Sequence, residues 1–136
     1  MKLINTLLAI FFISLSAPSW SITLDDLVER EGLYYKQFTD VPFTGEVTGE
    51  EQGSFKSGKK DGSWLWYWDN GQLRSKVNYK DGKREGASVA YYDNGQLRAK
   101  GNFKDGKRDG VGVIYRGNGH LEAKFNYENG KLEVAF

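Results

Sequence analysis

The residues best suited to molecular recognition are concentrated in one short segment, Trp64-Leu65-Trp66-Tyr67-Trp68, which holds three of the four tryptophans. Indole rings stack on sugar rings, and tryptophan and arginine are enriched in the hot spots of protein interfaces. Arg74 and Lys76 follow shortly after this segment. The candidate binding patch therefore consists of Trp64, Trp66, Trp68, Arg74 and Lys76, and it would suit a protein surface, a glycan or an anionic lipid head group.

Catalytic and metal-binding chemistry has little support in this sequence. There is no cysteine, and the one histidine, His120, takes the place that Gln72 and Gln96 have in related segments, so nothing pairs it with a nucleophile. Calcium requires several converging oxygen ligands, whereas lysines and arginines follow the aspartates of the glycine-rich segments. We predict no catalytic residue, no metal and no cofactor, and hence no enzyme.

The first residues have the pattern of an export signal. Lys2 precedes an apolar run from Leu7 to Leu15, and the small residues Ser19 and Ser21 follow. A transmembrane helix needs about 20 apolar residues, more than this run supplies before Pro18 interrupts it. We predict a signal peptide over residues 1–21 and a protein exported to the periplasm or secreted; an uncleaved anchor is the alternative.

The charge balance argues against nucleic acid as a partner. Without Lys2, the 19 basic residues become 18, which equals the number of acidic residues. A mature chain with no excess of positive charge lacks the basic footprint of nucleic-acid-binding proteins.

Two sequence blocks recur with a period of 24 residues. Asp69-Asn70-Gly71-Gln72-Leu73-Arg74 returns as Asp93-Asn94-Gly95-Gln96-Leu97-Arg98, and more loosely near Asn118. Lys80-Asp81-Gly82-Lys83 returns as Lys104-Asp105-Gly106-Lys107. Asn-Gly and Asp-Gly are strong hairpin signals, and apolar and polar residues alternate between these blocks. The sequence thus predicts an all-β protein, a curved antiparallel sheet of tandem β-hairpin repeats.

The length of the Asn-Gly loop decides which side chains share a face. A two-residue turn places Trp64, Trp66 and Trp68 on the packed face, which we assign to Leu73 and Tyr79 and their counterparts. A three-residue Asp-Asn-Gly loop with a glycine bulge instead places Leu65 and Tyr67 there. We favour the second register, because these positions stay apolar or aromatic in every repeat. The three tryptophans then share the other face with Arg74 and Lys76.

The domain boundaries follow from the repeat. Residues 22–62 form an N-terminal cap with a degenerate repeat, residues 63–134 form three hairpin repeats, and residues 135–136 end the chain. Thr23 to Glu31 can add one short helix, with Thr23 as its N-cap.

The repeat resembles MORN repeats, most clearly in the segment Gly101-Asn102-Phe103-Lys104-Asp105-Gly106-Lys107-Arg108-Asp109-Gly110. Phe103 replaces the usual tryptophan, and Asp109 replaces a common histidine. With its Asn-Gly-Gln-Leu element and longer period, the chain resembles the bacterial YwqK-family antitoxin group. This resemblance implies an open sheet of stacked hairpins and non-covalent binding, with toxin neutralisation as a special case.

We therefore expect an exported, non-enzymatic repeat module that binds an unidentified protein partner, with self-association as one form of that binding. A module that binds cell-envelope glycan or anionic lipid through the tryptophan-rich strand is the alternative.

Overall fold

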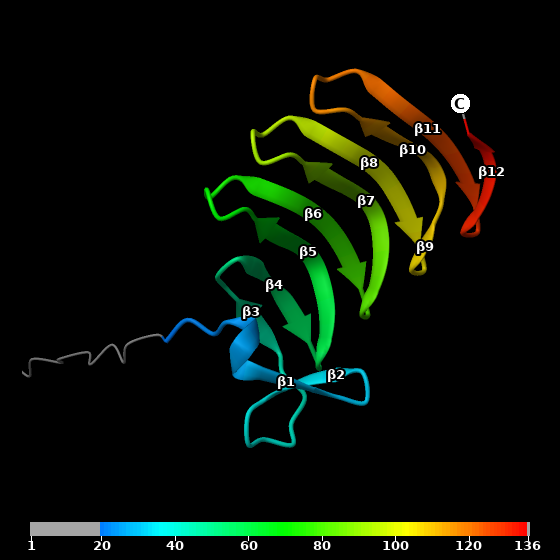
Figure 1. The fold of residues 1–136 in the computed structure, drawn as a ribbon. Coiled ribbons are helices and arrows are strands. Elements are labelled where there is room, and N and C mark those ends of the chain that lie inside the picture. The colour runs from blue at the N-terminus through cyan, green and yellow to red at the C-terminus, as the bar shows by residue number, and fades with distance from the viewer. Residues whose placement is uncertain (1–19, 136) are drawn as a thin grey trace, which may run out of the picture.

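The computed structural model describes residues 20–135 and shows a ten-stranded antiparallel sheet with a small two-stranded sheet packed against it (Figure 1). The elements are the 3-10 helix η1 (Leu24–Asp26) and the strands β1 (Leu27–Arg30), β2 (Leu33–Lys36), β3 (Gly45–Val47), β4 (Glu51–Lys56), β5 (Lys59–Tyr67), β6 (Leu73–Lys80), β7 (Lys83–Tyr91), β8 (Leu97–Lys104), β9 (Lys107–Arg108), β10 (Gly110–Tyr115), β11 (Leu121–Glu128) and β12 (Lys131–Ala135). Strands β3 to β12 follow one another in chain order across the large sheet, with β9 paired to β8. The predicted all-β repeat fold is confirmed.

Two kinds of turn alternate along the large sheet. At one end, Gly71 N–H donates to Trp68 O and Trp68 N–H donates to Gln72 O, both at 2.8 Å, which closes a three-residue Asp-Asn-Gly loop. The same pair of bonds closes the loops after β7 and β10. At the other end, Asp81 and Gly82 have φ values of 50° and 80°, as a two-residue type I′ turn requires. The loop length favoured from the sequence is thus confirmed.

The predicted faces were wrong because each hairpin contains a second irregularity. Tyr67 pairs with Leu73, but Trp66 pairs with Ser75, so Arg74 is an extra residue in β6. The three-residue loop alone would move the side chains of β6 to the other face relative to β5. The extra residue at Arg74 reverses this change for every later residue of β6. Trp64 consequently pairs with Val77, and Leu65 pairs with Lys76 on the opposite face. The same shift recurs in the hairpins β7–β8 and β10–β11.

The bulge also separates side chains that simple alternation would place together. Tyr91 lies two residues after Val89 in β7, so both point to one face, and Leu97 pairs with Tyr91. Leu97 therefore lies on the face opposite Phe103, which pairs with Gly86. The prediction that these leucines and aromatic residues share the packed face was wrong, and Leu121 is accordingly 55% exposed.

The N-terminal segment forms one 3-10 turn and a hairpin in place of the short helix expected from Thr23 to Glu31. η1 is a single turn, closed by Asp26, whose carboxylate accepts from the backbone N–H and the hydroxyl of Thr23 at 2.8 and 3.0 Å. These bonds lower the pKa of Asp26. From Leu27 onward the chain pairs with β2, because alternate burial of Leu27 and exposure of Val28 suits a strand better than a helix.

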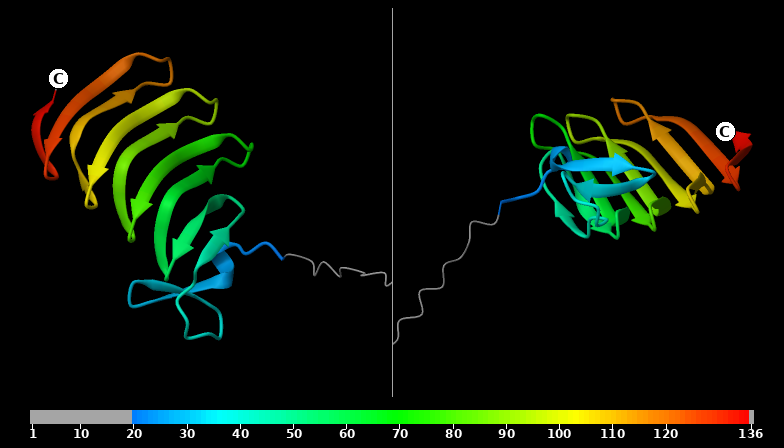
Figure 2. Two further views of the ribbon diagram at one scale, coloured as in Figure 1. Left: turned by 180° about the vertical axis from the view of Figure 1, so that it is seen from behind. Right: turned by 90° about the horizontal axis from the view of Figure 1, so that it is seen from below.

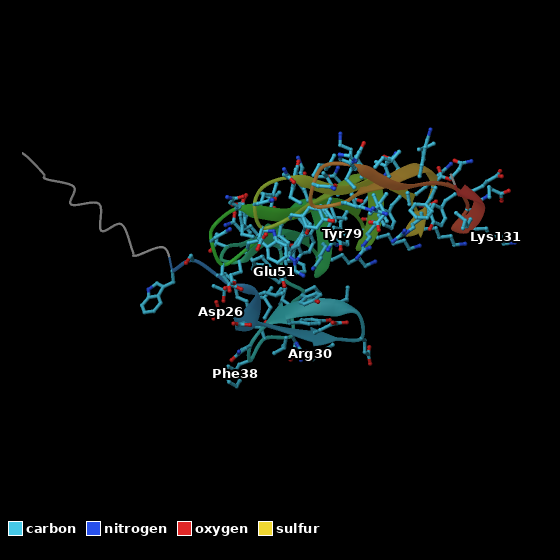
Figure 3. The ribbon with its side chains drawn as sticks, turned by 45° about the horizontal axis from the view of Figure 1, so that its top comes forward. Asp26, Arg30, Phe38, Glu51, Tyr79 and Lys131 are labelled. Carbon is cyan, nitrogen blue, oxygen red and sulfur yellow. The ribbon has the colours of Figure 1, made fainter. Side chains whose placement is uncertain are left out.

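The β1–β2 hairpin covers one face of the large sheet at its N-terminal end, as the view from below in Figure 2 and the view in Figure 3 show. We call this face the capped face and the opposite one the open face. The buried core lies between the hairpin and the first strands of the sheet. It consists of Leu27, Phe43, Val47, Phe55 and Trp64.

The predicted signal peptide lies mostly in residues 1–19, outside the described part of the chain. Between residues 20 and 135, no helix is long and apolar enough to span a membrane.

Candidate functional site

Large side chains fill the capped face in its first repeat, which comprises β5 and β6. Trp64 is completely buried, its Nε1–H donates to Ser54 O at 3.1 Å, and its ring meets that of Phe55 edge-on at 5.0 Å. Trp66 lies 6.1 Å from Trp64, between ring centroids, and is half-buried. The β1–β2 hairpin therefore rests on an aromatic platform.

A cation lies over this platform. Lys60 Nζ is 4.0 Å from the ring centroid of Trp64, 5.4 Å from that of Trp66 and 5.6 Å from that of Tyr79. Burial lowers the pKa of Lys60, whereas attraction to the Glu51 carboxylate partly restores it. The aromatic rings stabilise the half-buried ammonium group by cation–π attraction.

The same cation–aromatic arrangement recurs at intervals of 24 residues. Arg84 lies over Phe103 at 5.1 Å, and Arg108 lies over Tyr127 at 5.5 Å. Unlike Lys60, both arginines are exposed. The capped face therefore presents one repeated motif, which the β1–β2 hairpin covers only in the first repeat.

The later repeats leave the capped face hollow. The positions of Trp64 and Trp66 are occupied by Ser88 and Ala90 in the second repeat, and by Gly112 and Ile114 in the third. A groove of about 490 Å³ lies over these small residues. We call it the uncapped groove. Its floor consists of Ser88, Ala90, Ala99, Gly101 and Gly112.

The walls of the uncapped groove combine apolar and charged groups. Aromatic side chains come from Tyr92, Phe103, Phe125 and Tyr127. Arg98 and Arg108 supply positive charge, and Glu122 supplies one carboxylate. Arg108 Nη1 also donates to the Tyr127 hydroxyl at 3.4 Å. An occupant with apolar groups and a negative charge would match these walls.

The structure separates the patch predicted from the sequence. Trp64 is completely buried and cannot contact a partner. Lys76 lies on the open face, where it pairs with Leu65 of the neighbouring strand. Trp68 and Arg74 do lie together, with the guanidinium carbon 4.7 Å from the ring centroid. The Trp68 Nε1–H is buried and finds no acceptor among residues 20–135. Of the five predicted residues, only Trp68 and Arg74 thus form an adjacent pair of aromatic and cationic groups.

Sequence reasoning missed the uncapped groove, although its signal was present. The replacement of two tryptophans by Ser88 and Ala90 marks a loss of side-chain volume at fixed positions of a repeat, which predicts a hollow. His120 lies in the third Asn-Gly loop, where its backbone N–H donates to Asn118 Oδ1 at 3.1 Å. Nowhere in residues 20–135 do three side chains of His, Cys, Asp or Glu gather as a metal site needs.

The fold defines a class of protein, an open array of stacked β-hairpin repeats. Three segments of the chain, residues 60–81, 84–105 and 119–135, match the family model described as MORN repeat variant. The chain therefore contains this repeat variant three times. MORN repeats are commonly protein- or membrane-binding modules and are generally non-catalytic. No curated protein matches the chain.

Solved structures show only a weak likeness to this chain. Accessory secretory protein 1, 2 and 3 of Streptococcus pneumoniae is 12% identical over 82% of this chain and 20% of that one, with a TM-score of 0.40. TarM of S. aureus, a mutant in complex with Fondaparinux, alpha-GlcNAc-glycerol and UDP, is 16% identical over 83% of this chain and 20% of that one, with a TM-score of 0.38. The chain thus spans about a fifth of each of these proteins, and the likeness carries no argument about function.

Proposed function

We propose that this chain is a non-enzymatic protein-binding module whose uncapped groove holds a segment of its partner. The observation that carries the proposal is that the same face already holds a polypeptide. In the first repeat, the β1–β2 hairpin covers the aromatic platform at Trp64. The second and third repeats keep the cation–aromatic pairs but have small residues in place of the tryptophans, which leaves room for a ligand from outside.

The groove restricts how a partner can dock. Strands β7, β8 and β10 lie inside the sheet, where both neighbours use their backbone groups. A partner therefore cannot add a strand there and must be recognised through side chains. Ala90, Gly101 and Gly112 let an apolar side chain approach the sheet closely, and Arg98 and Arg108 favour an acidic neighbour. The expected ligand is an apolar segment that carries a carboxylate.

Filling the groove tests the proposal. A photo-reactive residue at position 90 in the native host should cross-link to the partner, and affinity is then measured with the purified partner. The double variant Ser88→Trp plus Ala90→Trp recreates the first repeat and should weaken binding at least tenfold. Ala87→Trp is the matched control, because Ala87 is exposed and its neighbour in register, Asn102, lies on the open face. Unchanged affinity in the double variant, with the fold intact by circular dichroism, would exclude the groove.

The same experiment decides between a different protein and a second copy of this chain. Self-association predicts a cross-linked species of twice the chain mass and a sedimentation coefficient that rises with concentration. The double variant should then remain monomeric. A cross-link only to another protein assigns the groove to a foreign partner.

We further propose that this binding takes place after export, on the basis of the charged and apolar pattern of the first 21 residues. A fusion to alkaline phosphatase, which is active only outside the cytoplasm, should be active with residues 1–21 and inactive without them. If the partner is a toxin, as the antitoxin resemblance implies, the exported form should restore growth and the leaderless form should not.

Trp68 and Arg74 support a second candidate, the binding of cell-envelope glycan or an anionic lipid head group. The half-buried Trp68 ring is suited to stacking on a sugar ring, and the adjacent Arg74 guanidinium group is suited to an anion. Titration with peptidoglycan fragments and with anionic vesicles should quench tryptophan fluorescence in the wild type but not in Trp68→Phe. No quenching by either ligand would dismiss this candidate.

A further inference from the structure

Lysines face each other across the two-residue turns at one end of the large sheet. Lys56 pairs with Lys59, Lys80 with Lys83 and Lys104 with Lys107, in register. A seventh lysine, Lys131, closes the last turn opposite Glu128. All seven are exposed, and within residues 20–135 none of them forms an ion pair. We call them the lysine rim; Figure 1 shows these turns along one end of the sheet, and Figure 3 labels Lys131.

Folding does not explain these pairs. Like charges directly opposite each other on neighbouring strands destabilise a sheet. The turn itself needs residues that accept positive φ, which Asp81 and Gly82 supply, and it needs no lysine on either side. The fourth turn shows that the fold accepts opposite charges at this register, since Glu128 pairs with Lys131. An unfavourable pair that recurs three times is better explained by a ligand that neutralises it.

The rim is regular because the turns stack directly on one another. Gly82 N–H donates to Lys60 O, Gly106 N–H to Arg84 O and Gly130 N–H to Arg108 O, each at 2.9 Å. The turn between β6 and β7 is thus bonded to β5, just after the preceding turn, and the later turns follow the same pattern. Successive lysine pairs are two strands apart, which corresponds to about 9 to 10 Å.

The charge of the rim is sparse. Asp81 and Asp105 partly offset the lysines beside them, and Glu85 accepts a hydrogen bond from Asp105 N–H at 2.8 Å. The central turn residues are Ser57, Asp81, Asp105 and Asn129, all of them polar. A lipid surface would favour apolar side chains beside the lysines. A densely charged polymer would bring more negative charge than the rim balances.

We propose that the lysine rim binds a linear anionic polysaccharide that carries about one acidic group per disaccharide. The length of a disaccharide is close to the separation of successive lysine pairs. Each pair can then hold one carboxylate, and the polymer lies across the strands along the stacked turns. This site is separate from the uncapped groove, so its failure would leave the proposed protein binding untouched.

Hyaluronan is a suitable probe, because it has one carboxylate per disaccharide. Calorimetric titration of the full chain at low ionic strength should show binding to long hyaluronan that disappears in high salt, as exposed charges are screened. A single disaccharide should bind at least tenfold more weakly, since it reaches only one turn. No binding of long hyaluronan, or equal binding of the disaccharide, would overturn the proposal.

Variants locate the site on the rim. Lys80→Gln plus Lys83→Gln should lower affinity roughly five- to tenfold, as expected for two exposed ion pairs. The control, Lys76→Gln plus Lys100→Gln, removes the same charge from the open face and should leave affinity within about twofold. Equal loss in both variants would refute the assignment. Glu128→Lys creates a fourth pair and should strengthen binding, a gain that misfolding cannot produce.

Two further probes separate the polymer from other anions. Long-chain polyphosphate has more negative charge per unit length than hyaluronan, and anionic lipid vesicles present their negative charge over a surface. Tighter binding of either one than of hyaluronan, measured at equal charge concentration and lost in the Lys80→Gln plus Lys83→Gln variant, would overturn the polysaccharide in favour of that ligand.

Discussion

The contact between the cap and the repeats depends chiefly on Trp64, and its truncation is the most direct test of the described packing. Trp64 is completely buried, packs against the rings of Phe55 and Trp66, and donates from Nε1–H to Ser54 O. Truncation of a buried tryptophan to alanine typically costs about 3 to 5 kcal/mol. We expect Trp64→Ala to lower the free energy of unfolding by this amount. For a domain of this size, such a loss is a large part of the total stability.

Urea denaturation followed by far-ultraviolet circular dichroism measures this loss. Phe38→Ala is the matched control, because the Phe38 side chain is fully exposed and its removal should change stability by less than about 0.5 kcal/mol. Limited proteolysis should show earlier cleavage in residues 20–47 of Trp64→Ala, since the cap loses its support. A loss below about 1 kcal/mol, or cleavage confined to the last repeats, would refute the packing described here.

Three further predictions concern the same framework. Gly53→Ala should lower the melting temperature by several degrees, because a Cβ atom at Gly53 would lie 2.4 Å from the Trp64 ring; an unchanged melting temperature would contradict the ring position. Asn70→Ala should lower the free energy of unfolding by about 1 kcal/mol in urea denaturation, because it removes the 2.7 Å hydrogen bond from Asn70 Nδ2 to Asp93 O. The loss should exceed that of Asn118→Ala, which removes only the loop hydrogen bond that Asn118 Oδ1 accepts from His120 N–H, the equivalent of the bond from Gln72 N–H to Asn70 Oδ1. Lys60→Met should flatten the pH dependence of stability below pH 10.5. Between the lowered pKa of Lys60 in the folded protein and pH 10.5, the unfolded chain binds more protons than the folded one, so wild-type stability rises with pH in this window. Equal pH profiles of the two proteins would show that Lys60 keeps its ordinary pKa.

The local structure could be predicted from the sequence because the turns are encoded locally. Asn70-Gly71 and Asp81-Gly82 each fix the backbone conformation with two residues, and the 24-residue period repeats both signals. The three-residue loop could also be chosen correctly, since the aliphatic and tyrosine positions persist in each repeat. These inferences need no knowledge of which residues meet across the sheet.

The assignment of faces failed because it depends on a residue with no local signal. Arg74 has no partner in β5, yet nothing in its type distinguishes it from Lys76 as a bulge residue. One extra residue moves every side chain beyond it to the other face. The candidate site then changed with the faces: Trp64 became core, Lys76 moved away from the tryptophans, and the hollow at Ala90 became the better site.

Backbone hydrogen bonds link each two-residue turn to the strand that follows the preceding turn, so the shape of the array does not depend on the side chains at its surface. They join main-chain atoms of Gly82 and Lys60, and then of Gly106 and Arg84, so the path of the chain does not depend on the exposed side chains beside the turns. The residues next to each turn can therefore change charge without altering the spacing between repeats. Glu128 shows such a change within the chain itself. An array built in this way can acquire a new charge pattern by single substitutions and present it at the same regular interval.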